Sequence, residues 1–213
     1  MRLTNLHLLI LAICSVITSG CATLDQTECE TADWYLIGFE DGSRGYDSSR
    51  IRSHRQACSQ AQITPQVDEY LEGLKRGYRD YCVANKGYQL GAQGGSYNNV
   101  CPADLAVEFA QAFQYGRDLY RINAAVGELE QRLQNNRSRM DELYAKSQDH
   151  EEQLLNTEGN TDNRRSHLNA IKANEREMLQ LEESSLYAER ELAVLRNDQQ
   201  QMEQQHQQQG YFR

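Results

Sequence analysis

Asp33, Asp41 and His54 are the candidates for acid–base chemistry in the N-terminal half. Asp33 and Asp41 lie near the start of this half, and His54 follows in the next charged segment. Hydrolysis by such groups needs a positioned pair of carboxylates, or a nucleophile such as serine beside a histidine. No recognisable spacing of that kind is present, and a single histidine among arginines is typical of a surface residue. We therefore expect a protein that is not an enzyme and has no cofactor.

The first residues resemble a bacterial secretory signal, which we place at residues 1–20. The apolar run within it, residues 6–17, is shorter than the roughly 20 residues that a membrane-spanning helix needs. Small residues then lead to Cys21 in a pattern that resembles the bacterial lipobox, although Thr18 stands where that pattern prefers leucine. The resemblance implies that Cys21 becomes the acylated N-terminus, followed by a sorting context for the outer membrane. An ordinary signal peptide with an incidental Cys21 is the alternative.

Four further cysteines could bind a metal or form disulfides: Cys29, Cys58, Cys82 and Cys101. Zinc sites use closely spaced pairs such as Cys-x-x-Cys, whereas these cysteines are separated by 29, 24 and 19 residues, so we expect no metal site. Four cysteines in an exported chain indicate two disulfides, with three possible connectivities. Sequential pairing closes the shortest loops and is the connectivity that we expect.

An aromatic residue followed by two glycines spaced four apart recurs between residues 31 and 120. The copies begin at Tyr35, Tyr70, Tyr88 and Phe109, the last with alanine in the first glycine position. On a helix the paired small residues share one face, and each glycine there costs about 1 kcal/mol relative to alanine. One explanation is close helix–helix packing. The other is a groove that binds a small ligand or the cell wall. Its possible binding residues are Trp34, Tyr35, Asp41, Tyr70 and Tyr88.

The same half carries ordered landmarks of cysteine, glycine and aromatic residues. They are residues 29–42 (CETADWYLIGFEDG), 54–58 (HRQAC), 70–73 (YLEG), Tyr81-Cys82, 85–91 (NKGYQLG) and 96–102 (SYNNVCP). In this order they resemble a bacterial lipoprotein family catalogued as domain of unknown function 2799, over about residues 20–120. The resemblance implies a secreted or lipid-anchored envelope protein, and it implies no particular activity.

From Leu119 onward, apolar residues recur at steps of three and four. The first series is Leu119, Ile122, Val126, Leu129, Leu133, Met140, Leu143 and Leu154; the second is Ile171, Met178, Leu181, Ala188, Leu192, Leu195 and Met202. Both are heptad seams, with Asn136, Ser147 and His150 at polar core positions and Leu168 out of step. A polar cluster between them predicts an antiparallel hairpin of helices 121–157 and 164–205, with a frayed tail at 206–213. Pairing between chains is the alternative.

The composition excludes one class of partner. The chain has 213 residues and a net charge of −9, so it lacks the basic surface that binds nucleic acid. The expected fold class is all-α: a linker at 21–30, a small disulfide-stapled helical module at 31–120 and the long hairpin or coiled coil. The expected location is the outer membrane, facing the periplasm. The expected partners are the membrane, through a lipid anchor, and an envelope protein or a second copy, through the coiled coil.

Overall fold

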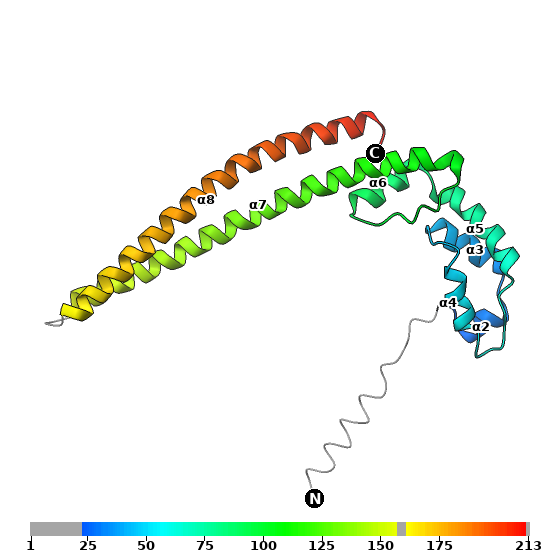
Figure 1. Cartoon of the computed structure of the whole chain (residues 1–213), viewed down its shortest axis with the longest axis horizontal. Helices are drawn as coiled ribbons and strands as arrows, with labels where there is room; N and C mark the ends of the chain where they lie inside the picture. Colours follow the sequence, from blue (N-terminus) through cyan, green and yellow to red (C-terminus); the bar gives the residue numbers. More distant parts are fainter. Residues whose placement is uncertain (1–22, 157–160, 212–213) are drawn as a thin grey trace, which may run out of the picture. The chain divides into compact units, whose positions relative to one another are not determined.

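The structure is a computed structural model that describes residues 23–156 and 161–211. Every regular element in these residues is a helix (Figure 1). The helices are α2 (Gln26–Glu30), α3 (Trp34–Ser43), α4 (Arg50–Ala57), α5 (Val67–Tyr81), α6 (Ala84–Ala92), α7 (Ala103–Asn156) and α8 (Thr161–Gln208). The expected all-α fold class is confirmed.

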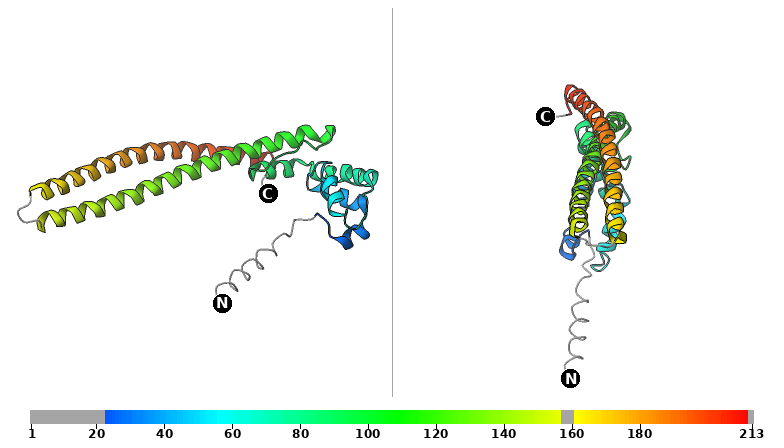
Figure 2. Two further views of the ribbon diagram at one scale, coloured as in Figure 1. Left: turned by 60° about the horizontal axis from the view of Figure 1, so that its bottom comes forward. Right: turned by 90° about the vertical axis from the view of Figure 1, so that its left-hand side faces the viewer.

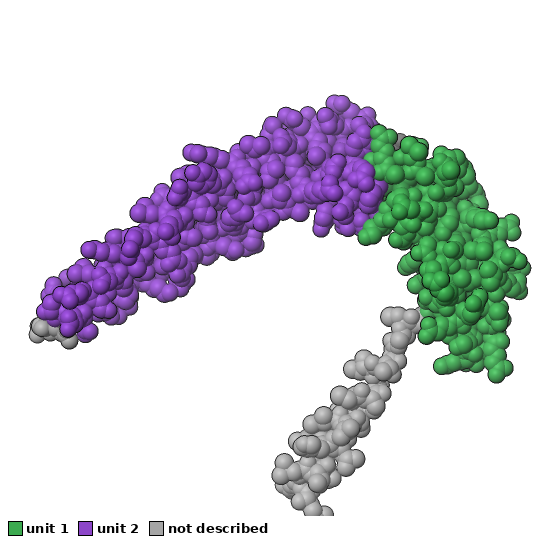
Figure 3. All heavy atoms as spheres, in the orientation of Figure 1, with its two compact units in different colours: residues 1–87, 96–112 green, residues 88–95, 113–213 purple. Residues whose placement is uncertain are grey.

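The chain divides into two compact units (Figure 3). The first, here called the disulfide unit, contains described residues up to 87 and residues 96–112. The second, the hairpin unit, contains residues 88–95 and 113–211 of the described chain. The division differs from the expected boundary at residue 120, because part of α6 packs against α7. A Cβ on Gly91 would overlap the carbonyl oxygen of Phe113, so the absence of a side chain there permits this close approach.

The disulfide unit has a small core that surrounds a buried disulfide. Cys29 and Cys58 are joined, and their core neighbours are Trp34, Ile51, Tyr70 and Leu74. A second disulfide joins Cys82 and Cys101. The connectivity is the sequential one. Such cross-links constrain the unfolded chain, and each typically contributes about 2–4 kcal/mol to a unit whose core is this small.

In the hairpin unit, α7 and α8 run antiparallel and side by side (Figures 1 and 2). The buried part of their seam contains Val126, Leu129, Ala188 and Leu192, all of which belong to the expected heptad series. Side-chain hydrogen bonds between the two helices show the same antiparallel direction, because the residue numbers of their partners rise along α7 and fall along α8. They join Asn123 to Gln199, Glu130 to Arg196 and Glu177 to Arg139. The arms therefore pair within one chain.

Polar side chains fill part of the same seam. The Asn136 amide donates to the hydroxyls of Ser184 and Ser185, at 3.3 and 3.1 Å. Farther along, the Asn174 amide donates to the Ser147 hydroxyl at 3.1 Å. Partners on the opposite helix thus satisfy the polar core positions that weaken the heptad pattern, in the way that buried polar groups require.

The C-terminal end of α8 differs from the frayed tail expected at 206–213. α8 continues to Gln208, and the His206 side chain is buried. The Tyr88 hydroxyl and the His206 Nδ1 lie 3.0 Å apart, and the ring of Tyr211 stacks on that of Tyr88. The glutamine-rich end of α8 is therefore held by the packing of His206 and Tyr211 against Tyr88, and the low-complexity pattern gave no sign of this contact. Phe212 and Arg213 lie outside the described residues.

Candidate functional site

The disulfide unit brings α3 and α5 into direct backbone contact through their glycines. A Cβ on Gly38 would overlap the Tyr70 carbonyl oxygen, and a Cβ on Gly73 would overlap that of Tyr35. The glycine faces are therefore covered by the partner helix, which is the packing explanation of the aromatic–glycine repeat. The alternative of an open Tyr/Gly groove is wrong for this pair of helices, because a backbone occupies the space that a ligand would fill.

Three local features fix the start of α3 and place α4 beside the α3–α5 pair. The Asp33 carboxylate accepts a hydrogen bond from the Leu36 backbone N–H at 2.9 Å and so caps the start of α3. At the other end of α3, Gly45 adopts a φ of +78° in the turn that leads toward α4. The Cys29–Cys58 disulfide holds the residue that ends α4. These constraints direct one face of α4 toward α3 and α5.

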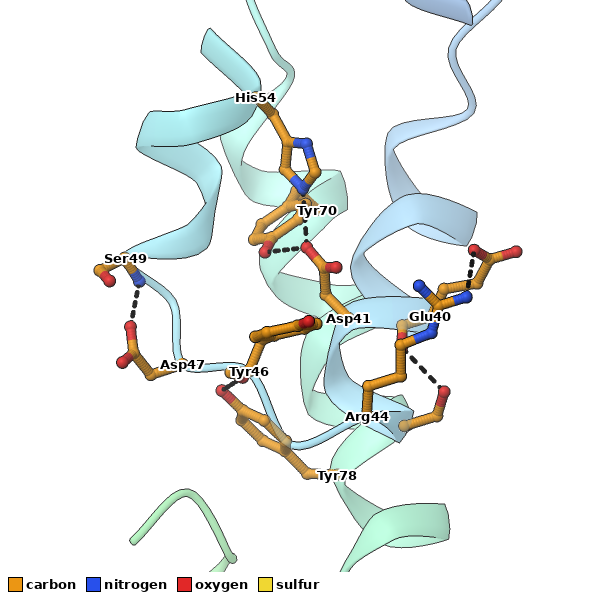
Figure 4. Close-up of polar contacts among 10 residues, drawn as sticks. Glu40, Asp41, Arg44, Tyr46, Asp47, Ser49, His54, Tyr70 and Tyr78 are labelled. Atoms are coloured by element: carbon orange, nitrogen blue, oxygen red, sulfur yellow. Dashed lines mark hydrogen bonds and ion pairs between the residues drawn. The ribbon is translucent and has the colours of Figure 1, made fainter. Parts of the chain in front are cut away.

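A buried polar cluster forms where the three helices meet (Figure 4). The Nε2 of His54 lies 2.7 Å from the Oδ2 of Asp41, and the Tyr70 hydroxyl donates to the same oxygen at 2.8 Å. The three residues are 3%, 5% and 0% exposed, respectively. Because a carboxylate oxygen can only accept, the Nε2 of His54 carries the proton that it shares with Asp41. The other ring nitrogen, Nδ1, is buried and has no hydrogen-bond partner among the residues that the structure describes.

The environment of this cluster keeps nearby tyrosines protonated. Burial raises the pKa of Tyr70, and the hydrogen bond to Asp41 and the charge of that carboxylate add to the effect. Burial also raises the pKa of Tyr78 to about 12, with smaller contributions from Asp47 and Asp41. The Tyr78 hydroxyl donates to the Tyr46 carbonyl oxygen at 2.9 Å. Both hydroxyls therefore act as hydrogen-bond donors across the neutral pH range.

The geometry of the cluster favours a structural role over catalysis. A general base or nucleophile must reach its substrate within hydrogen-bond distance. Asp41, His54 and Tyr70 are instead closed off from solvent and directed toward one another. What the cluster does is connect α3, α4 and α5 through one carboxylate oxygen, with both donors satisfied by that acceptor. A buried charge-assisted network of this kind specifies how the three helices are arranged.

The structure distributes the sequence-predicted binding residues over different environments. Asp41 and Tyr70 come together in the buried cluster, and Trp34 lies in the same core. Tyr35 is exposed on α3, whereas Tyr88 belongs to the hairpin unit and contacts His206 there. Within the disulfide unit, Trp34, Asp41 and Tyr70 are therefore buried in the core, and only Tyr35 reaches the surface.

The prediction that His54 is a surface residue among arginines is wrong. It is buried because its ring faces α3 and α5, whereas neighbours such as Arg52 and Arg55 are exposed. The signal available in the sequence was the helical spacing of Ile51 and His54, which share one face of α4 and are its buried residues. The contact of Tyr78 with the Tyr46 backbone had no sequence signal, because it joins residues far apart in the chain.

The fold and this site define a class of protein: an all-α chain with a disulfide-linked helical unit followed by a long antiparallel hairpin. Residues 33–118 match the model of a family described as "Protein of unknown function (DUF2799)". The match confirms the family resemblance of this part of the chain, and it names no activity. No curated protein and no solved structure matches the chain.

The predicted lipid attachment falls on Cys21, which lies outside the described residues, as does the signal segment at residues 1–20. Within residues 23–156 and 161–211, none of the helices combines the length and apolar character of a membrane span.

Proposed function

We propose that this protein is a non-enzymatic bacterial cell-envelope lipoprotein, anchored by an acylated Cys21 and facing the periplasm from the outer membrane. The α7–α8 hairpin is its interaction arm, which binds an envelope protein or another copy of the chain. The disulfide unit connects that arm to the membrane anchor.

The pair of buried disulfides is the observation that carries this proposal. Cys29, Cys58 and Cys82 are almost fully buried in their cross-linked form. Such bridges form and persist in oxidising compartments such as the periplasm, and small exported units depend on them. This supports export of the chain, and the N-terminal pattern that ends in Cys21 supplies the route and the anchor. The lipobox resemblance implies a diacylglyceryl thioether and an amide-linked acyl chain on Cys21, and these three acyl chains would bury many more methylene groups than the single chain that gives marginal membrane binding.

The polar network supports a non-enzymatic role. Asp41 and His54 are the acid–base residues that a hydrolase of this chain would use, and both are occupied within the packed unit. The long hairpin leaves several large apolar side chains on its surface, including Tyr144, Leu179 and Tyr187. Exposed apolar surface of this kind is typical of protein interaction sites.

Intact-mass analysis of the protein from a bacterial membrane fraction tests the anchor, the export and the cross-links together. We expect a chain that begins at Cys21 and carries the mass of its acyl groups, with a gain of four hydrogen atoms when a thiol reductant reduces both disulfides. Cys21→Ser should abolish the added lipid mass. Cys14→Ser is the matched control, since that residue lies in the segment that is removed. A wild-type chain without lipid would contradict the anchor.

A further inference from the structure

The outer side of α8 carries a patch of large apolar side chains. Leu179, Leu186, Tyr187 and Val194 are 64%, 50%, 62% and 60% exposed, respectively. We call these four residues the α8 patch. Exposed large apolar residues scattered singly on a surface need no explanation, whereas a row of them on one helix face does.

Helical spacing shows that the patch lies on the side of α8 away from α7. The seam with α7 uses Ala188, Leu192 and the partly buried Leu195. Leu179 and Leu186 are two turns apart, as are Tyr187 and Val194, and both pairs point away from the seam at 3.6 residues per turn. The patch extends about 22 Å along the helix at 1.5 Å per residue. It is a second apolar face on a helix whose first apolar face α7 already covers.

Two opposite charges lie within the patch. Glu183 and Arg190 occupy the same outer face, between the apolar residues. Neither makes an ion pair with any described residue of its own chain. Together with Leu186 and Tyr187 they line a shallow hollow of about 120 Å³ at the middle of the patch.

The order of these residues is self-complementary. We take as centre the point between Leu186 and Tyr187 and consider only the residues of this outer face. Toward the N-terminus they are Leu186, Glu183 and Leu179, and toward the C-terminus they are Tyr187, Arg190 and Val194. The two charges on the face therefore have opposite sign, whereas Glu182, Glu189 and Glu191 flank it at helical spacing. A second α8 in antiparallel orientation, with a two-fold axis at this point, therefore sets Leu186 against Tyr187 and Leu179 against Val194. Glu183 of each copy then faces Arg190 of the other, as an isologous interface requires.

The charges also select this orientation. A parallel copy in register would place Glu183 against Glu183 and Arg190 against Arg190, and like charges at helix contacts are destabilising.

We propose that the chain forms a homodimer in which two α8 helices pack antiparallel through the α8 patch. This inference rests on the proposed interaction role of the hairpin and names its partner as a second copy. Stable interfaces typically bury about 800 Å² per partner, and we expect this four-residue patch to bury less area than that. Association should therefore depend on concentration. Attachment of both copies to one membrane would raise their effective concentration.

Charge reversal in the full-length chain, purified in detergent and measured by sedimentation velocity over a concentration series, tests the pairing. Glu183→Arg or Arg190→Glu should each weaken dimerisation about tenfold, because either change creates two like-charge contacts across the axis. The double variant E183R/R190E should restore wild-type association. Glu151→Arg, an exposed reversal on α7, is the matched control and should leave dimerisation unchanged. A wild-type chain that stays monomeric at every concentration, or a double variant no better than the single ones, would overturn the proposal.

Engineered cysteines test the orientation in cells. Leu179→Cys together with Val194→Cys should give a disulfide-linked dimer that a reductant separates, because each position faces the other across the axis. Neither substitution alone should give this cross-link. Cross-linking by Leu179→Cys alone would indicate a parallel pair and contradict the antiparallel register. The wild-type chain supplies the background. The lipid state of Cys21 is measured separately by mass, so a failed anchor and a failed dimer give different results.

Discussion

At the scale of single residues, one carboxylate oxygen connects three helices. Asp41 accepts from both His54 and Tyr70 at short distances in a site closed to solvent. Removing an acceptor of this kind leaves two buried donors unsatisfied, and each such donor costs about 1–3 kcal/mol. Removing one donor leaves the other hydrogen bond intact. The consequences of substitution should therefore be unequal across the cluster.

We expect Asp41→Ala to lower the free energy of unfolding of the disulfide unit by about 3–5 kcal/mol, and Tyr70→Phe to lower it by about 1–2 kcal/mol. Urea unfolding followed by fluorescence measures both, because Trp34 is the only tryptophan and lies in this core. Asp80→Ala, at an exposed position of α5, is the control and should stay within about 0.5 kcal/mol of wild type. Equal effects for Asp41→Ala and Asp80→Ala would contradict the role of the cluster.

Alkaline pH provides a second test at the residue scale. The pKa of Tyr78 is raised from 10.0 to about 12, so the unfolded chain loses its phenolic proton at a lower pH than the folded chain. The stabilisation is therefore complete below pH 10 and is lost as the pH rises toward 12. Each such tyrosine contributes a slope of up to about 1.4 kcal/mol per pH unit in this window. Tyr78→Phe should flatten the dependence of unfolding free energy on pH between 10 and 12. An unchanged slope would exclude Tyr78 as its source.

At the scale of elements, glycines decide how closely helices pack. Gly38 and Gly73 face a neighbouring backbone, where an added Cβ has no space, whereas a Cβ on Gly127 of α7 would meet nothing within 4 Å. The same substitution should therefore have opposite signs at the two kinds of position. Where the space is open, alanine avoids the conformational cost of a helical glycine.

Gly38→Ala is expected to destabilise the disulfide unit by about 2–4 kcal/mol, because α3 and α5 must separate or shift. Gly127→Ala is expected to stabilise the hairpin by about 0.5–1 kcal/mol. Thermal unfolding, followed by Trp34 fluorescence for the first variant and by circular dichroism at 222 nm for the second, would measure the two effects. Destabilisation by both substitutions would show that the helix interior at residue 127 is more constrained than the structure indicates.

The polar positions of the hairpin seam are a further feature of the elements. Asn136→Leu replaces an amide that bonds Ser184 and Ser185 with a side chain that suits a heptad core position. We expect the thermal midpoint of the hairpin to rise while the alignment of the two helices becomes less specific. Disulfide trapping between cysteines placed at Asn123 and Gln199, which face each other in the wild type, measures the register. Slower trapping in the Asn136→Leu background is the expected result.

At the scale of the whole molecule, the two units depend on different interactions. The disulfide unit has a small core with covalent cross-links, whereas the hairpin has a long, narrow seam of apolar and polar pairs. Reduction should therefore affect them unequally. The Cys29–Cys58 bridge is the one inside the core, so its removal is the more informative change.

The double variant C29S/C58S should lose about 3–4 kcal/mol of stability, as expected for a loop of this length. Its Trp34 fluorescence should shift to that of an exposed indole at a lower urea concentration than in wild type. The bulk helical signal, which comes mainly from α7 and α8, should persist to higher urea. Simultaneous loss of both signals would show that the two units unfold together.

Much of this architecture follows from local pattern. The heptad seams predicted the hairpin because apolar side chains at steps of three and four must share one helix face. Cysteine spacing indicated the sequential disulfides, since the shorter loops close at lower entropic cost. Two glycines four apart predicted close helix packing for the same geometric reason. These features depend on residues that are near one another in the chain, or on the covalent geometry of a pair.

Contacts between distant residues were decided by the tertiary structure. His54 reaches Asp41 and Tyr70 because the turn at Gly45 and the Cys29–Cys58 bridge place α4 against α3 and α5, and no periodicity encodes that meeting. His206 and Tyr211 dock near Tyr88 because the hairpin returns the end of α8 to α6, although the local composition suggests a frayed end. Periodicity alone establishes which face of a helix is apolar. Whether that face is covered depends on the position of every other element, and this is why the exposed patch on α8 is visible only in the folded molecule.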